Sequence, residues 1–189
     1  MNAIASAPIA IGTWNVDASH SNVGFMVRHL MIAKVRGNFT KVTGTVTVPE
    51  DPFATVVDVV IDPNSITTGD DARDGHLRGA DFLDSEKYGQ ITFRSTSVSE
   101  VKGGYQLVGD LTLHGVTKSV ALDVEFEGVS KDPWGNTKAG FSASGEINRK
   151  DWGIEYNAAL ETGGVLIGEM VKLQLDIELA GSPSAAPAD

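Results

Sequence analysis

Residues 171–179 read VKLQLDIEL, and apolar and polar side chains alternate at every position of this stretch. A strand with this pattern has one face in a core and the other in water. The same period of two recurs at 122–127, 42–48 and 23–29. The alternation predicts an all-β fold of antiparallel strands, because strands of parallel sheets are usually apolar on both faces.

Short turns separate the predicted strands. Gly103-Gly104 and His114-Gly115 are typical of two-residue hairpin loops, and a longer loop at 133–136 precedes the stretch 137–148. About eight strands fit between these turns. We expect them to close into a barrel, because closure removes exposed edges. A barrel of this size is either filled by its own side chains or holds one small ligand, and the alternation does not choose between the two.

One segment departs from the strand pattern. Residues 70–89 read DDARDGHLRGADFLDSEKYG, in which Asp70 or Asp71 can cap a helix and the acidic first turn suits the helix dipole. Residues 85–88 followed by Gly89 are typical of a second short turn. The sequence therefore predicts one short helical excursion beside the sheet.

Length, charge and cysteine content limit the classes of function. The chain has 189 residues, no cysteine and a net charge of −10. The length suits one domain, which we place at 12–180, with flexible termini at 1–11 and 181–189. The acidic charge disfavours nucleic acid as a partner, and the lack of cysteine excludes thiol nucleophiles and cysteine-ligated metals. No stretch is long and apolar enough to span a membrane.

The first twelve residues, MNAIASAPIAIG, contain no lysine or arginine and are interrupted by Pro8. A secretory signal needs a basic start and an apolar segment of about 7–15 residues. We therefore expect a cytoplasmic protein, although export is not excluded.

Histidines and catalytic motifs point to no particular chemistry. The four histidines lie too far apart in sequence for a local metal motif, and no nucleophile elbow, phosphate-binding loop or zinc motif occurs. We accordingly predict no catalytic residue, no metal ligand and no cofactor. His29 continues the apolar stripe of 23–27, so its ring is expected to line the barrel and to need a polar partner there.

Two charged segments have alternative interpretations. Arg73, His76 and Arg78 lie within six residues and could form a rim that holds an anion, or could pair with the neighbouring aspartates. Arg149 could pair with Asp151 across a turn. The phenylalanines of the strands fit either a plain core or the wall of a ligand site.

Several motifs together carry a family resemblance. They read WNVDASHSNVGFMVRH (14–29), VRGNF (35–39), SITT (65–68), RDGHLR (73–78), DFLD (81–84), GDLTLHGVTK (109–118), RKDWG (149–153) and VLIGEMVKL (165–173). The sequence resembles the YceI-like proteins, a lipocalin-like polyisoprenoid-binding family, over about 14–179. Gly89 departs from the family pattern, which usually has proline there.

The resemblance implies an extended eight-stranded, antiparallel, lipocalin-like β-barrel that encloses an apolar tunnel. It implies a bound long-chain isoprenoid lipid, of the quinone type or a prenyl phosphate, and a possible homodimer. Burial of such a chain is favourable at about 25 cal/mol per Å² of apolar surface. On this basis the expected tunnel wall is Val23, Phe25, Val27, Phe39 and Phe141. The expected polar mouth is His29, Arg73, His76, Arg78 and Arg149.

A hollow barrel needs small residues, and the strand glycines Gly24, Gly44, Gly109 and Gly140 are candidates for making room, or else mark bulges. The preferred function is a non-catalytic carrier. One alternative is an enzyme that acts on a buried lipid, and another is a metal-using structural module with a solid core. A modified lipid would favour the first alternative, and a metal lost on substitution of His29 or His76 would favour the second.

Overall fold

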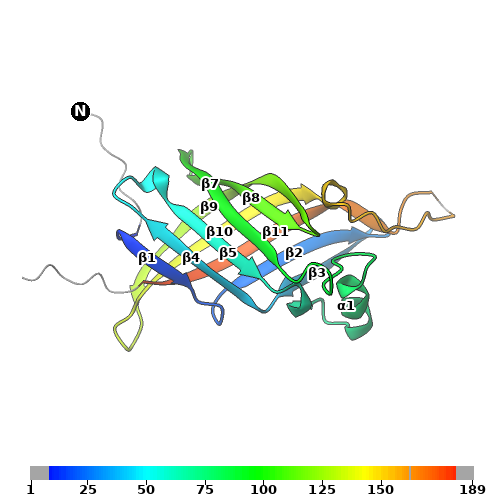
Figure 1. The fold of residues 1–189 in the computed structure, drawn as a ribbon, viewed down its shortest axis with the longest axis horizontal. Helices are drawn as coiled ribbons and strands as arrows, with labels where there is room; N and C mark the ends of the chain where they lie inside the picture. The colour runs from blue at the N-terminus through cyan, green and yellow to red at the C-terminus, as the bar shows by residue number, and fades with distance from the viewer. Residues whose placement is uncertain (1–8, 162, 182–189) are drawn as a thin grey trace, which may run out of the picture.

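The computed structural model describes residues 9–161 and 163–181 (Figure 1). In this part of the chain eleven strands form one sheet. The strands are β1 (Gly12–Val16), β2 (Asn22–His29), β3 (Ala33–Phe39), β4 (Val42–Val48), β5 (Val56–Ile61), β6 (Ile66–Thr67), β7 (Ile91–Val101), β8 (Gly104–Leu113), β9 (Val116–Lys131), β10 (Thr137–Asn148) and β11 (Ile167–Gly181). One α-helix, α1 (Asp71–Arg78), and three short 3₁₀ helices, Pro52–Ala54, Pro63–Ser65 and Arg149–Trp152, complete the fold.

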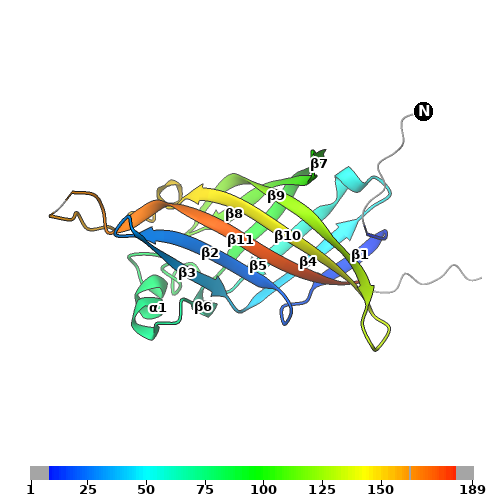
Figure 2. The same cartoon turned by 180° about the vertical axis from the view of Figure 1, so that it is seen from behind.

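The sheet closes on itself because β1 pairs with both β4 and β11 (Figure 2). All pairings between the strands are antiparallel. Three long strands are each interrupted once and so appear as the pairs β1 and β2, β3 and β4, and β5 and β6. Strands β1 and β2 pair along the same edge of β11. On their other side they pair with β4 and β3, which in turn pair with β5 and β6. With these pairs joined, the architecture is the closed eight-stranded antiparallel barrel that the sequence predicted.

The interruption between β1 and β2 is held by hydrogen bonds to one residue of β11. The Asp17 N–H donates to the Glu178 carbonyl at 2.8 Å, and the Ser21 hydroxyl accepts from the Glu178 N–H at 3.0 Å. These bonds satisfy backbone groups that the broken strand leaves unpaired.

The predicted short helical excursion is confirmed. Asp70 caps α1 by accepting the Arg73 N–H at 2.9 Å, and the helix ends at Arg78 with Gly79 as its C-cap. Turns then follow at 80–83 and 85–87, the second of them where the sequence predicted a second short turn. At this end β3 pairs with β6 only through Asn38 and Phe39, and α1 lies beside these two strands in both views. The helix therefore covers a part of the barrel where strand pairing is incomplete.

Buried side chains form two clusters. The smaller cluster closes the β1 end of the barrel and consists of Ile9, Trp14, Val48, Ala139 and Leu179. The larger cluster extends along the barrel to Trp152 and Ile154. Of the expected flexible termini, residues 1–8 and 182–189 lie outside the described residues.

Candidate ligand-binding cavity

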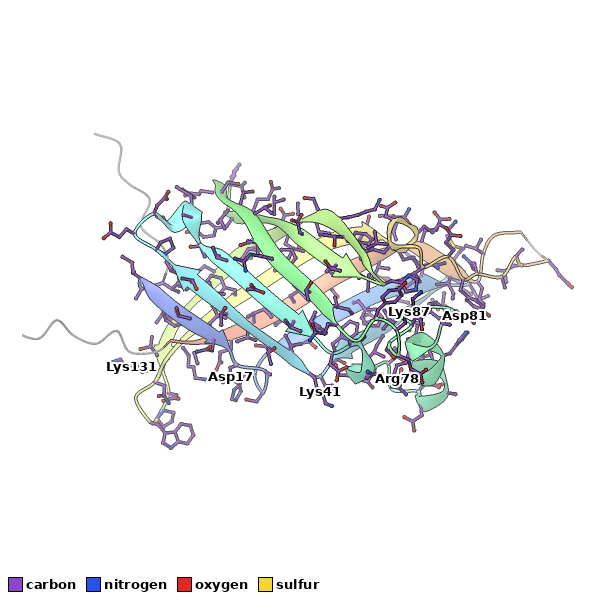
Figure 3. All side chains as sticks on the ribbon, viewed as in Figure 1. Asp17, Lys41, Arg78, Asp81, Lys87 and Lys131 are labelled. Carbon is purple, nitrogen blue, oxygen red and sulfur yellow. The ribbon has the colours of Figure 1, made fainter. Side chains whose placement is uncertain are left out.

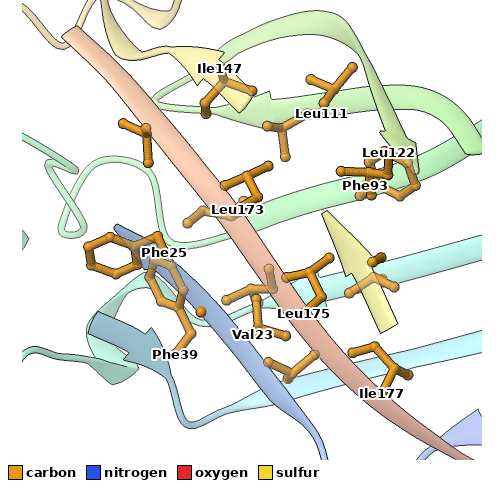
Figure 4. A pocket seen from close by; sticks show the side chains of 18 of the residues that line it. Val23, Phe25, Phe39, Phe93, Leu111, Leu122, Ile147, Leu173, Leu175 and Ile177 are labelled. Atoms are coloured by element: carbon orange, nitrogen blue, oxygen red, sulfur yellow. The ribbon is translucent and has the colours of Figure 1, made fainter. Parts of the chain in front are cut away.

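An apolar cavity of about 440 Å³ lies inside the barrel. Its wall includes side chains from both ends of the barrel, from Val48 and Phe53 near one end to Leu77 and Ile154 near the other. The inward side chains of β11 on this wall, such as Leu173 and Leu175, remain partly exposed (Figure 4). A tightly packed core would bury them fully, so the interior is hollow.

The five residues expected to form the tunnel wall all line this cavity. Val23, Phe25 and Val27 come from β2, Phe39 from β3 and Phe141 from β10. The rings of Phe25 and Phe39 lie 5.8 Å apart at 46°, and Figure 4 shows both on the same side of the cavity. Their contact with a ligand remains a prediction.

The polar lining of the cavity is cationic. Among the described residues on its wall the charged side chains are Arg28, Arg73 and Arg149, together with His29, and no aspartate or glutamate lines it. Thr55 and Tyr105 add hydroxyl groups near the β4–β5 end. An anionic or strongly polar group entering from the α1 end would therefore meet hydrogen-bond donors without a competing carboxylate.

Arg149 is the most buried of these cations, with 4% of its surface exposed. It follows β10, where its Nε donates to the Gly168 carbonyl at 2.9 Å and its Nη1 to the Ile154 carbonyl at 2.7 Å. A third, longer bond of 3.5 Å reaches the Ile167 carbonyl. Burial lowers the pKa of Arg149 below its usual value. These bonds go to carbonyls rather than to Asp151, and a guanidinium with five N–H groups has donors left for a ligand.

Arg73 is held at the rim by residues of the preceding loop. Its Nε donates to the Thr68 hydroxyl at 2.6 Å, and its Nη2 donates to the Thr68 carbonyl at 3.1 Å. The same hydroxyl donates to the buried Asp74 carboxylate at 2.5 Å. Burial raises the pKa of Asp74, but the hydrogen bonds from Thr68 outweigh this effect and lower it below the usual range. The ionised Asp74 thus fixes the loop that positions Arg73.

The other two residues expected at the mouth do not line the cavity. His76 Nε2 lies 2.8 Å from an Asp81 carboxylate oxygen, and its ring packs edge-on against Phe82 and Tyr156 at 5.0 Å each. Figure 3 shows Arg78 and Asp81 on the α1 side of the molecule. The structure therefore brings His29, Arg73 and Arg149 to the cavity and places His76 and Arg78 beside it.

Among the polar residues that line the cavity, Arg28, Thr55 and Tyr105 were not predicted. Tyr105 continues the inward alternation of β8 that includes Leu107 and Leu111, so the period of two could have identified it. Arg28 lies on the outward face of β2 by alternation. It reaches the cavity where the register of β2 and β11 shifts opposite 27–29, and no sequence pattern shows that shift.

A separate polar cluster lies near the β1 end. Asp17, His20 and Glu178 place ligand atoms within 4.8 Å of one another, a spacing compatible with a metal ion. The Lys138 ammonium, however, lies 2.5 Å from an Asp17 oxygen and 3.1 Å from a Glu178 oxygen. The lysine thus supplies the positive charge that these carboxylates require, and we interpret the cluster as a structural ion-pair network.

The barrel fold agrees with comparisons to known proteins. The model of the YceI-like domain matches residues 14–179. The chain belongs to the YceI-like family. A UPF0312 protein of Staphylococcus aureus is 42% identical over 166 residues, which cover 87% of this chain and 95% of that protein.

Solved structures share the fold of this YceI-like chain. A YceI protein of Campylobacter jejuni is 30% identical with a TM-score of 0.69, covering 88% of this chain and 96% of that one. Burkholderia cenocepacia BcnA gives a TM-score of 0.73 at 22% identity, covering 86% and 98%. A polyisoprenoid binding domain from Saccharophagus degradans gives 0.67 at 19% identity, covering 92% and 100%. The last two likenesses establish the fold alone.

Proposed function

We propose that this protein is a non-catalytic carrier of a long-chain polyisoprenoid or a similar amphipathic lipid. The observation that carries the proposal is the hollow apolar interior, whose wall is aliphatic and aromatic along the barrel. A cavity of about 440 Å³ lies within the ~300–1,000 Å³ typical of small-molecule sites. An apolar chain gains free energy there by leaving water.

The head group is assigned to the α1 end. Arg73, Arg149 and His29 supply cationic or hydrogen-bonding groups at that end of the wall, and the described lining residues include no carboxylate. This arrangement supports a phosphate or a quinone head, since both accept hydrogen bonds. The polyisoprenoid-binding name of the Saccharophagus degradans structure is consistent with the same ligand class.

The first experiment is mass spectrometry of an organic extract of the purified protein, together with a native mass of the intact complex. We expect a prenyl lipid at about one molecule per chain, and the native mass also tests the expected homodimer. A chemically altered lipid after incubation would favour an enzyme instead. Failure to take up any of several added prenyl lipids would contradict the carrier function.

A matched pair of variants on α1 tests the head-group assignment. Arg73 lines the cavity and Arg78 does not. Arg73→Ala is expected to weaken binding of a prenyl phosphate about tenfold or more, as a lost charge-assisted hydrogen bond contributes about 1.5–3 kcal/mol. Arg78→Ala should leave binding nearly unchanged. Equal effects of the two substitutions would refute this placement of the head group.

A further inference from the structure

The turn between β2 and β3 breaks two local rules of protein structure. Leu30 and Met31 both have positive φ, 52° and 62°, in a turn closed by a hydrogen bond from the Ile32 N–H to the His29 carbonyl. Such turns strongly prefer asparagine, aspartate or glycine. Here they carry three consecutive apolar residues, of which Met31 is 54% and Ile32 82% exposed.

The fold gains little from this apolar tip. Leu30 is partly covered, and its N–H donates to the Leu166 carbonyl at 2.9 Å. Ile32 points into solvent. Strained backbone and exposed aliphatic side chains at one place indicate a role outside the packing of the domain.

The hairpin that carries the tip is also the basic part of an acidic chain. No aspartate or glutamate occurs between Asp17 and Glu50, although the chain has 25 acidic residues. Arg28, Lys34 and Arg36 are exposed on this hairpin, and none of them forms an ion pair within the described part of the chain. Arg28 and Lys34 lie directly opposite each other in the β2–β3 register. The hairpin therefore presents unneutralised positive charge beside its apolar tip.

The tip lies at the end of the barrel where the cationic part of the cavity wall is found. Arg28 and His29, which precede the turn, both line the cavity. The loop residues 155–161 and 163–166 project from the same end in both views (Figures 1 and 2). Glu155 and Glu161 of this loop reduce the local positive charge but do not cancel the three cations of the hairpin.

From these observations we propose that the β2–β3 hairpin docks on the surface of an anionic lipid bilayer, with Met31 and Ile32 inserted among the head groups. Apolar side chains flanked by lysine and arginine are the combination that favours such interfaces. Charge complementarity identifies the bilayer as the partner. Docking in this orientation would bring the cationic end of the cavity to the membrane.

The absence of cysteine from the chain allows a direct test. Ile32→Cys and, as a matched control, Trp134→Cys are each labelled with a polarity-sensitive fluorophore. Trp134 is 83% exposed at the tip of the β9–β10 hairpin at the other end of the barrel. Its backbone N–H donates to the Asp132 carboxylate, so the nearby cation Lys131 is accompanied by a negative charge there. We expect a blue shift at residue 32 with phosphatidylglycerol-containing vesicles, and none at residue 134.

Vesicle flotation of unlabelled protein supplies the second measurement. The double variant Lys34→Gln/Arg36→Gln is expected to bind about thirtyfold more weakly, because each cation near an anionic surface contributes about fivefold. Met31→Ser/Ile32→Ser should reduce binding at least tenfold while the circular dichroism spectrum and thermal midpoint stay unchanged. The vesicles contain no isoprenoid, so a negative result here leaves the carrier function standing.

Three outcomes of the vesicle experiments would overturn the proposal. They are equal blue shifts at residues 32 and 134, equal binding to vesicles of phosphatidylcholine alone, and no binding to any vesicle. A native mass that changes from dimer to monomer on Met31→Ser/Ile32→Ser would show that a second copy of the chain covers the tip instead of a membrane.

Discussion

The two ends of the barrel are built differently. At the β1 end, Trp14 packs with Val48, Ala139 and Leu179, and each of these residues is less than one-tenth exposed. At the α1 end, β3 and β6 pair through only two residues, and a helix and a turn-rich segment cover the gap. The β1 end follows the rules of a stable core. The α1 end carries the buried unpaired Arg149, the cationic lining and a strained apolar turn. Deviations from local rules concentrate at functional regions, so the comparison places stability at one end and ligand handling at the other.

The largest expected effect comes from Trp14, whose indole N–H donates to the Ala10 carbonyl at 2.9 Å. Trp14→Ala is expected to reduce the free energy of unfolding by about 3–5 kcal/mol, because it empties a closely packed site. At the α1 end, Ile32→Ser should change it by no more than about 0.5 kcal/mol. Urea unfolding followed by circular dichroism measures both. A loss below about 1 kcal/mol in Trp14→Ala would mean that the β1 end is not the stable one.

The ion-pair network of the β1 end predicts a pH dependence. The hydrogen bond from Lys138 holds the pKa of Asp17 well below its usual 3.8, and the same contact raises the pKa of Lys138 above 10.5. A carboxylate with a lowered pKa stabilises the fold above its unfolded pKa, and this contribution is lost as the pH falls through the folded value. The raised lysine contributes below 10.5 and loses its contribution as the pH rises through its folded value.

Lys138→Met is therefore expected to reduce the free energy of unfolding at neutral pH. The difference in free energy of unfolding between this variant and the wild type should shrink below pH 3.8, because Asp17 of the unfolded chain becomes protonated there. Lys131→Met is the control, because the described residues include no ion pair of Lys131. Urea unfolding across the acidic range measures the free energy of unfolding of each variant relative to the wild type. If the loss in Lys138→Met stays constant down to pH 2, the ion-pair network does not contribute as proposed.

Glycine substitutions contrast a strand of the barrel with the helix at its α1 end. A Cβ at Gly109 would lie 2.4 Å from the Phe93 ring, so Gly109→Ala is expected to cost about 1–3 kcal/mol by overpacking. A Cβ at Gly75 of α1 would meet nothing within 4 Å, so Gly75→Ala should add about 0.5–1 kcal/mol of stability through helix propensity. Thermal unfolding distinguishes the loss of stability expected for Gly109→Ala from the gain expected for Gly75→Ala. Similar losses at both positions would show that α1 is as tightly packed as the barrel wall.

These glycines also show what the sequence could and could not predict. Alternation assigned the inward face of β2, and Val23, Phe25 and Val27 of that strand line the cavity, as do Phe39 of β3 and Phe141 of β10. Alternation could not give the volume of the interior. Gly109 was expected to make room for a ligand, yet Phe93 already occupies the space over it, and Gly140 lies at a register shift, as its alternative interpretation predicted. Alternation specifies which side chains point inward, whereas their combined packing determines whether a hollow remains.

The polar residues were harder to predict for a related reason. Arg73 and Arg78 lie on one short helix, and only the helix position relative to the barrel decides that Arg73 lines the cavity. That position depends on Asp74 and Thr68, which are held together by hydrogen bonds between groups six residues apart. Spacing along the chain contains no information on this docking.

The hollow itself is tested by a substitution in the cavity wall that is expected to change stability little. Ala143 on β10 faces the cavity, and its neighbour Ser144 faces solvent. Ala143→Leu adds three carbons to the wall. If the interior is hollow, the larger side chain should change the unfolding free energy by less than about 1 kcal/mol and shorten the longest prenyl chain that co-purifies. If the interior were solidly packed, the same change would overpack it and cost about 1–3 kcal/mol.

Ser144→Leu is the control, since it adds comparable apolar volume to the outer face of the same strand and should leave the bound chain length unchanged. Mass spectrometry of extracts from the two variants and the wild type gives the chain lengths, and urea unfolding gives the free energies. A stable Ala143→Leu protein that carries chains of unchanged length would show that the lipid lies elsewhere along the barrel. A destabilised one without bound lipid would instead support the solid core, and the partly exposed side chains of β11 would then need another explanation.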